Sequence, residues 1–392
     1  MPYHPYIIGT MRKIFKQLHI WLSIPLGVVI AITCFSGAML IFEKEITRMV
    51  QSDYYYVEEV KGEPLPLDEL IARVEPTLED GRRITGVTIT DDPERSYQVN
   101  LNEPKRAALF VDQYTGEVLG EPGRLEFFQD MFRLHRWLMD ERPEDEEAVF
   151  WGKMIVGTST LLMVIIILTG IVLWWPKTLK ALKHRSKIAL RKGWHRFWYD
   201  LHVAGGIYAT LLLLAMALTG LTWSFEWYNK GFYKTLGVDT EESGGGHSSD
   251  KSGGKSRSSA KGSTDNPYLH WSDVAKEVES RHGEFAEMTI SKGEVKVKSH
   301  DYGNQRAKDT YKFDSATGEI LAVELYADKE YDSKVKGWVY SVHVGSWGGI
   351  VTRIMWFLAA MLGATLPLTG YYLWIRRKFF KKSDKAQPKE GA

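Results

Sequence analysis

Four long windows of this sequence contain no Asp, Glu, Lys or Arg, and they constrain the fold more than any other feature. They cover residues 17–42, 154–176, 201–225 and 354–375. Each is longer than the roughly 20 helical residues that cross the hydrocarbon core of a bilayer. Because lipid offers no partner for backbone polar groups, a segment of this kind must satisfy them within a helix. The sequence therefore predicts a membrane protein, mainly α, with four transmembrane helices.

The basic residues predict how these helices are oriented. Lys and Arg gather before the first helix, in residues 177–197 between the second and third helices, and from Arg376 onward. These three segments lie on one side of a four-span chain, and cytoplasmic segments carry an excess of Lys and Arg. We therefore expect cytoplasmic N- and C-termini in a bacterial inner membrane. The position beside the bilayer accounts for the charge of the loop, so we expect no nucleic-acid partner.

The first and third hydrophobic windows repeat one another at a fixed distance. His19 and His202 are 183 residues apart, and so are the dipeptides Ser36-Gly37 and Thr219-Gly220. The same offset over a whole helix length, without a gap, indicates internal duplication. The sequence thus predicts a bundle with pseudo-twofold symmetry, in which equivalent residues face each other.

The segments outside the windows also resemble one another. Residues 111–119 and 313–321 both read as a strand, an Asp-x-x-Thr-Gly turn and a second strand. Asp bonds nearby backbone amides and Gly accepts a positive φ, which suits a turn. Strands are expected before each turn, at 86–90, 97–101 and 294–298, with helices at 67–74 and 271–281. Two small α+β modules on the periplasmic side are therefore predicted.

The second and fourth windows carry matching Thr-Gly pairs, Thr169-Gly170 and Thr369-Gly370. All four helices therefore contain a Ser/Thr-Gly dipeptide. Small residues let membrane helices pack closely, and the missing side chains could equally leave room for a flat cofactor. Both interpretations remain open and are compatible.

The duplication sorts the histidines into pairs. His19 and His202 lie at the cytoplasmic ends of the first and third helices, whereas His135 and His343 precede the second and fourth at the outer side. Ionisable residues within membrane segments are rare and usually functional. His195 has no histidine counterpart at the offset of 183, although it lies seven residues from His202 and on the same expected helix face.

Two facing histidines without an accompanying carboxylate or thiolate favour haem iron over a zinc or di-iron site. We therefore predict two non-covalent b-type haems, one held by His19 and His202 and the other by His135 and His343. The chain has no Cys-x-x-Cys-His motif for covalent haem attachment, and its single cysteine, Cys34, allows no internal disulfide. Arg136 and Arg353 are weaker candidates, as partners of haem propionates, and His195 is a weaker candidate ligand.

The order of these motifs resembles one known family. Leu-His-x-Trp at 18–21, the two Asp-x-x-Thr-Gly modules, Thr-Gly-x-x-Leu-Trp-Trp-Pro at 169–176 and Trp-Tyr-Asp-Leu-His at 198–202 are similar to the PepSY-associated transmembrane-helix family. The resemblance covers residues from about 10 to 378. The family includes haem-containing ferric-siderophore reductases of the inner membrane, which implies reduction of a periplasmic Fe(III) chelate and release of its iron.

The expected organisation is as follows. Transmembrane helices are predicted at 11–43, 151–176, 198–226 and 349–375, a basic loop at 177–197 and a tail at 376–392, with PepSY-like modules at 44–150 and 227–348, the second interrupted by a Gly/Ser-rich linker at 241–263. No nucleotide-binding fingerprint is present, so the electron donor is expected to be a quinol or a cytoplasmic reductase. Two alternatives remain: a non-enzymatic membrane protein that binds or regulates a peptidase, and a transporter component of iron uptake.

Overall fold

The computed structural model describes residues 5–145, 148–238, 266–300 and 303–380. Four helical segments in this part of the chain are long and apolar enough to cross a membrane. Their bounds are Met11–Leu40, Trp151–Trp174, Trp194–Trp223 and Ser346–Phe380. The four predicted spans are thus present, each within a few residues of its expected position. The linker at 241–263, with His247, and the end of the tail lie outside the described residues.

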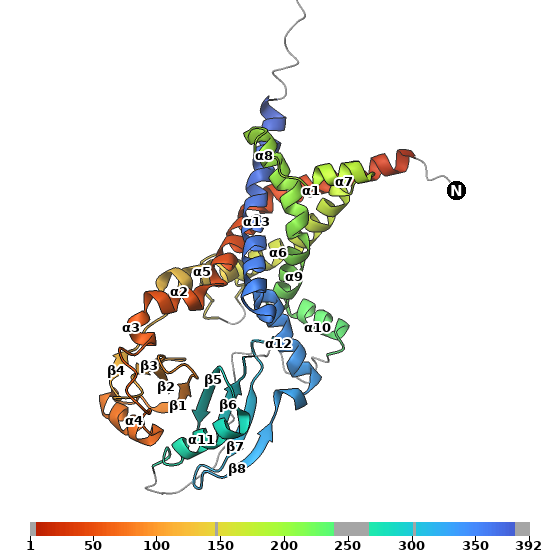
Figure 1. The fold of residues 1–392 in the computed structure, drawn as a ribbon. Coiled ribbons are helices and arrows are strands. Elements are labelled where there is room, and N and C mark those ends of the chain that lie inside the picture. Colours follow the sequence, from red (N-terminus) through yellow and green to blue (C-terminus); the bar gives the residue numbers. More distant parts are fainter. Residues whose placement is uncertain (1–4, 146–147, 239–265, 301–302, 381–392) are drawn as a thin grey trace, which may run out of the picture. The chain divides into compact units, whose positions relative to one another are not determined.

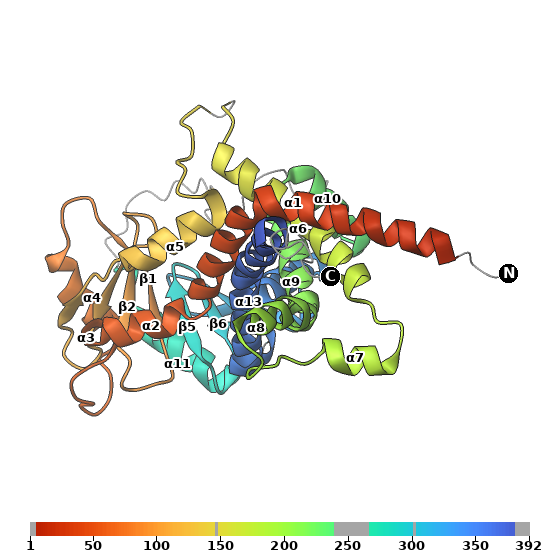
Figure 2. The same cartoon turned by 90° about the horizontal axis from the view of Figure 1, so that it is seen from above.

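The four spans form a bundle in which each helix packs against two others (Figures 1 and 2). Helix α1 (Pro5–Leu40) packs against α6 (Trp151–Trp174) and α13 (Gly349–Ile375), and so does α9 (Gly206–Gly220). The third span begins with α8 (Trp194–Asp200). Between α8 and α9 lies η2 (Leu201–Gly205), a π-helical turn that contains His202. Single π-helical turns inside α-helices are frequently found at functional sites.

Two further helices belong to the compact unit that contains the bundle. This bundle unit comprises Met1–Phe42, Glu126–Gly244 and Val339–Ala392. It therefore includes α5 (Glu126–Trp137), which carries His135, and the end of α12 (Tyr331–Val344), which carries His343. The sequence placed both histidines within the outer modules. They belong instead with the bundle, because the apolar faces of α5 pack on α1 and α6.

Shorter helices complete the bundle unit. They are α7 (Leu179–Arg185) in the basic loop, η3 (Leu221–Trp223) and α10 (Glu226–Thr235) after the third span, η5 (Ser346–Gly348) before α13, and η6 (Arg376–Phe380) after it. The hydroxyl of Tyr228 on α10 donates to the carbonyl of Leu218 on α9 at 2.9 Å. The side-chain amide of Asn229 donates to the carbonyl of Thr222 at 2.9 Å. Helix α10 is therefore folded back against the end of the third span.

The second compact unit, the sheet unit, comprises Glu43–Leu125 and Gly245–Trp338. Its strands form one antiparallel sheet in the order β4-β3-β2-β1-β5-β6-β7-β8 (Figure 1). The strands are β1 (Ile84–Ile89), β2 (Tyr97–Leu101), β3 (Ala108–Val111), β4 (Val118–Gly120), β5 (Glu287–Ser291), β6 (Glu294–Lys298), β7 (Asp309–Phe313) and β8 (Ile320–Glu324). The strands of both predicted modules thus join in a single sheet, because β1 pairs with β5 and neither strand is left with an open edge.

The pairing of β1 with β5 places similar residues opposite each other. Val87 is paired with Ile290, Thr88 with Thr289, and Ile89 with Met288. The hydroxyls of Thr88 and Thr289 are hydrogen-bonded at 3.0 Å. The two aligned sequences, Val-Thr-Ile and Met-Thr-Ile, thus run past each other in opposite directions about a central pair of threonines.

One face of the sheet carries the core of this unit. Helices α4 (Leu67–Val74) and α11 (Trp271–His282) contact each other, and their apolar residues form one cluster with the inward side chains of the strands. The remaining helical segments are α2 (Glu43–Val50), α3 (Ser52–Tyr55), η1 (Glu75–Thr77) and η4 (Tyr326–Asp328). Both helices and the strands β2 and β6 lie where the sequence predicts them, to within one residue.

The two Asp-x-x-Thr-Gly turns have the geometry that their sequence predicts. The Asp112 carboxylate accepts hydrogen bonds from the backbone amides of Tyr114, at 2.7 Å, and Thr115, at 3.2 Å. The Asp314 carboxylate accepts one from Ala316 at 2.7 Å. Gly116 and Gly318 both have a φ of +75°, which a residue with a Cβ adopts only at a cost.

Candidate functional site: two histidine pairs

The first histidine pair lies between diagonally placed helices of the bundle. The rings of His19, on α1, and His202, in η2, have centroids 6.4 Å apart and planes at 83°. His19 Nδ1 lies 3.0 Å from the hydroxyl oxygen of Thr169 on α6. His202 Nδ1 lies 2.8 Å from the hydroxyl oxygen of Thr369 on α13. The two residues that the sequence pairs by the offset of 183 therefore face each other, each bonded to a third helix.

The second pair lies between the helices that precede the second and fourth spans. The ring centroids of His135, on α5, and His343, on α12, are 6.1 Å apart, with planes at 47°. His135 Nδ1 donates to the carbonyl of Thr33 on α1 at 2.8 Å. His343 Nδ1 lies 3.1 Å from the hydroxyl oxygen of Thr219 on α9. The looser sequence correspondence between these two histidines is thus matched by their contact.

Backbone carbonyls determine the protonation of all four rings. Besides the contacts above, three of the Nδ1 atoms lie next to a carbonyl three residues before the threonine: Ile166 at 3.0 Å, Leu366 at 3.2 Å and Met216 at 3.1 Å. A carbonyl oxygen can only accept, so Nδ1 carries the proton and Nε2 of the neutral ring has a free lone pair. No hydrogen bond to any of the four Nε2 atoms occurs among the described residues. Each histidine therefore retains the nitrogen that binds metals.

The Ser/Thr-Gly pairs are the docking positions of these rings. A Cβ at Gly37 would lie 2.7 Å from Cε1 of His135, and one at Gly220 would lie 2.9 Å from Cε1 of His343. A Cβ at Gly170 or Gly370 would lie 3.4 Å from Cε1 of its histidine in the other pair. Helix packing and room for a flat cofactor were the two interpretations open from the sequence. The structure adds a more specific one, because each glycine makes room for an imidazole and the preceding residue or its turn accepts the Nδ1 proton.

The separations within the pairs match two imidazoles on one metal ion. A metal–nitrogen bond of about 2.0 Å, with about 1.1 Å from the nitrogen to the ring centre, places two ring centroids about 6.2 Å apart across a shared ion. The measured distances are 6.4 and 6.1 Å. Within the described ranges no group of three or more His, Cys, Asp or Glu could hold a metal. Each pair therefore offers two protein ligands, and the remaining positions would have to come from a cofactor.

An apolar layer separates the two pairs. It is built around Ala209, Leu213 and Ala359, with Cys34 and Met163 among the residues packed on it. On α1, the position of the first pair and the turn that receives His135 are about 14–18 residues apart, or about 24 Å at 1.5 Å per residue. A hydrocarbon core is about 30 Å thick. The pairs therefore lie toward opposite ends of the membrane-spanning part.

Burial keeps the second pair neutral. Desolvation, and then the neighbouring His135, lower the pKa of His343 to about 3. Desolvation also lowers the pKa of His135. Both side chains lie outside the four spans and are neutral imidazoles near pH 7, which is the protonation state that a metal requires.

The weaker candidates differ in their surroundings. His195 is exposed, and its ring centroid lies 6.1 Å from that of Tyr372 on α13. Arg136 is half-buried beside His135, its guanidinium lies 5.3 Å from the ring centre of Trp137, and it has no carboxylate partner among the described residues. Arg353 donates to the carbonyl of Ile41, so it is engaged at the end of α1. Of the two arginines, Arg136 is the better placed for an anionic group near the outer pair.

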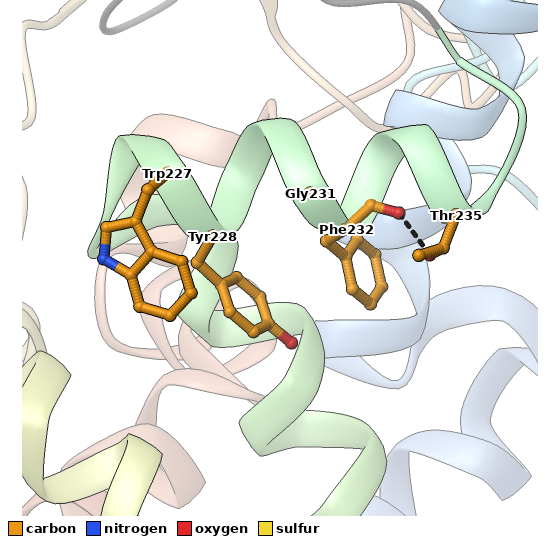
Figure 3. A pocket seen from close by; sticks show the side chains of 5 residues that line it. All are labelled: Trp227, Tyr228, Gly231, Phe232 and Thr235. Atoms are coloured by element: carbon orange, nitrogen blue, oxygen red, sulfur yellow. Dashed lines mark hydrogen bonds between the residues drawn. The ribbon is translucent and has the colours of Figure 1, made fainter.

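The sequence missed the residues that position the rings. Thr169, Thr219 and Thr369 supply hydroxyl acceptors, and Thr33 supplies a carbonyl. The repeated Ser/Thr-Gly dipeptide was the available signal. A shallow hollow elsewhere on the bundle unit, lined by Trp227, Tyr228, Gly231, Phe232 and Thr235 of α10, contains none of the four histidines (Figure 3).

Comparisons with known proteins agree with the architecture. A comparison with curated proteins finds no match for this chain. The sequence profile of the family described as PepSY-associated TM region matches residues 16–377, which include all four spans, the sheet unit and the four paired histidines. The chain therefore belongs to the PepSY-associated TM region family.

Proposed function

We propose that this protein carries electrons across the membrane through two b-type haems and reduces an Fe(III) chelate on its outer side. The observation that supports this most strongly is the pair of histidine pairs, with ring centroids 6.4 and 6.1 Å apart, near opposite ends of one bundle. Two separated redox centres are what a transmembrane electron carrier requires. A single buried pair would have no such implication.

The residues around the pairs fit haem. A porphyrin supplies four nitrogen ligands and leaves two axial positions, which is the number of ligands that each pair offers. The ring of Trp223 lies 5.1 Å from that of His343, so the outer pair has aromatic surroundings. Arg136 would hold a propionate, since guanidinium binds carboxylate well. When bound, haem supplies a one-electron change at its iron.

The protein's own contribution is to fix the ligands and to keep water away. The carbonyls and hydroxyls that accept the Nδ1 protons set the tautomer and orientation of each ring, and such outer partners raise the basicity of the ligating nitrogen. The apolar layer between the pairs excludes water and ions from the path. Its side chains do not titrate, so charge crosses this layer only as an electron.

The direction of transfer follows from the basic segments. The positive-inside rule places the loop at 177–197 in the cytoplasm and the sheet unit in the periplasm of a bacterial inner membrane. Electrons would enter at His19 and His202 from a quinol or a cytoplasmic reductase and leave from His135 and His343. Fe(II) binds hard oxygen ligands more weakly than Fe(III), so reduction favours release of iron from the chelate.

The matched contacts also support internal duplication of the bundle. His135 bonds to Thr33 as His343 bonds to Met216, and Thr33 and Met216 are 183 residues apart. We infer that two copies of a two-helix unit with an outer α+β module gave rise to this pseudo-twofold arrangement. Each copy then contributes one ligand to each haem.

The visible spectrum of the purified, dithionite-reduced protein tests this function. We expect the spectrum of low-spin b-type haem and about two haems per chain. A colourless protein from haem-replete cells would refute the proposal and favour a PepSY protein that binds a partner such as a peptidase, or a transporter component. Stopped-flow oxidation of the reduced protein by an Fe(III) chelate then tests the reductase activity.

Single substitutions test the ligands. His202→Ala is expected to remove one of the two haems, whereas His195→Ala, at an exposed histidine on the same span, keeps both. Loss of a haem only in the His195 variant would show that the pairing at the offset of 183 is wrong. His135→Ala and His343→Ala are expected to lose the other haem.

A further inference from the structure

The sheet unit contains an arginine that is buried without an acidic partner. Arg95 is 8% exposed, and its Nε is buried and has no hydrogen-bond partner. No ion pair or hydrogen bond of its guanidinium occurs among the described residues. Burying a cation without a counter-ion is costly, so an unpaired arginine at this depth requires a compensating partner.

Local structure holds Arg95 in place. The backbone of Tyr56 forms an antiparallel bridge with that of Arg95. On either side, the amide of Val57 donates to the carbonyl of Glu94 at 2.9 Å, and the amide of Ser96 donates to that of Tyr55 at 3.2 Å. The guanidinium lies 5.7 Å from the ring centre of Tyr55 and 5.8 Å from that of Tyr56. The chain after α3 is thus clamped over the arginine.

A surface hollow adjoins this arginine. Glu45, Arg48, Met49, Ser52 and Tyr56 line it. Tyr56 both lines the hollow and lies over the guanidinium of Arg95. The lining therefore combines one cation, one carboxylate and one hydroxyl with the apolar surfaces of Met49 and Tyr56.

The electrostatic surroundings of the hollow are mainly positive. Desolvation, and then the charge of Arg48, lower the pKa of Arg95, while Asp92 acts in the opposite direction. Desolvation, and then Lys44, lower the pKa of Lys298, to which Arg48 also contributes. Four cations therefore repel one another around a place where Glu45 and Asp92 are the nearby carboxylates. An incoming anion would relieve this repulsion.

The geometry points to a binding site for an anionic, oxygen-ligated metal chelate at this hollow, with Arg95 and Arg48 as its charged contacts. The inference rests on the proposed function, because it identifies where the Fe(III) chelate docks on the outer part of the protein. Guanidinium groups bind anionic oxygens with directional hydrogen bonds. The apolar surfaces of Met49 and Tyr56 favour a ligand with aromatic rings over a bare inorganic anion.

Gallium(III) complexes separate docking from reduction, because gallium(III) is not reduced under these conditions. The full-length protein in nanodiscs of zwitterionic lipid is titrated calorimetrically with a trianionic gallium(III) tris-catecholate. We expect saturable binding to the wild type and binding about 10- to 100-fold weaker to Arg95→Gln, as for loss of a charged hydrogen bond. Arg82→Gln is the matched control, since Arg82 is bonded through two nitrogens to Glu121 at 2.8 Å, and its affinity should equal that of the wild type.

Further arms decide between ligands of related chemistry. An uncharged gallium(III) trihydroxamate should bind at least about tenfold more weakly than the tris-catecholate, since it cannot form the ion pairs. Displacement by millimolar inorganic phosphate would overturn the inference in favour of a simple anion site. Loss of chelate binding in phosphatidylglycerol nanodiscs would overturn it in favour of a lipid headgroup.

A second variant guards against misfolding. If Arg95→Gln unfolds, Arg48→Gln at the rim of the hollow should weaken binding in a folded protein. Unchanged affinity in both variants, or no binding to the wild type, would refute the site. A colourless protein that still binds the gallium chelate would refute the proposed electron transfer alone, whereas a two-haem protein without chelate binding would refute this inference alone.

Discussion

The close approach of Gly37 to His135 provides a sharp test of the outer pair. In Gly37→Ala, the new Cβ would lie 2.7 Å from Cε1 and 2.8 Å from Nδ1 of the ring. Ordinary van der Waals contact begins near 3.4 Å, so the ring must move by about 0.7 Å. The hydrogen bond from Nδ1 to the carbonyl of Thr33, now 2.8 Å, would then lengthen to about 3.5 Å, the limit of a useful bond.

The cost of this change can be estimated. Alanine favours a helix over glycine by up to about 1 kcal/mol, whereas overpacking costs about 1–3 kcal/mol and a weakened hydrogen bond about 1 kcal/mol. The net destabilisation is therefore about 1–3 kcal/mol. It is concentrated on the position of one ligand, so haem binding should suffer more than folding does.

Haem content measured as the pyridine haemochromogen checks this reasoning. We expect Gly37→Ala to fall from about two haems per chain to about one, with the outer haem lost or left with one axial ligand. Gly370→Ala is the matched control, because its Cβ would lie 3.4 Å from Cε1 of His202, and it should retain both haems. Two haems with an unchanged spectrum in Gly37→Ala, or equal losses in both variants, would refute the assignment of glycine as space for the ring.

Two further predictions concern hydrogen bonds. Thr369→Val removes the hydroxyl 2.8 Å from His202 Nδ1 and should weaken the binding of one haem about 10- to 100-fold, measured by haem transfer to apomyoglobin. Thr365→Val, whose hydroxyl bonds the Leu362 carbonyl within α13, should leave the transfer rate unchanged, and equal rates in both would contradict the role of Thr369. Asp112→Ala removes two acceptor contacts in a turn and should destabilise the sheet unit by about 1–2 kcal/mol. Thermal unfolding followed by circular dichroism measures this loss, and an unchanged midpoint would show that Asp112 is dispensable for the turn.

Much of the secondary structure was accessible from local sequence. The absence of charge over more than 20 residues determines a membrane helix, since no other element satisfies its backbone in lipid. The turns at Asp112 and Asp314 could be predicted because their chemistry lies within five consecutive residues. Strands β2 and β6 and helix α4 alternate in burial as their sequences indicate.

Long-range pairing was not accessible in the same way. The sequence predicted two α+β modules, whereas β1 and β5 join them into one sheet. Both the exposed edges of two small sheets and the paired edges of one large sheet are compatible with the same strand sequences. Only the tertiary structure distinguishes them, because the choice depends on which edges meet.

The candidate site divides along the same line. The sequence by itself determined which histidines are equivalent, since an offset of 183 can be read without coordinates. Only the tertiary structure decided that each ring docks on a Ser/Thr-Gly pair of another helix, and that Arg95 is buried without an acid. These contacts join residues more than 30 positions apart, and no local pattern encodes a neighbour at that distance. Repetition reveals which residues correspond, and packing decides what each of them touches.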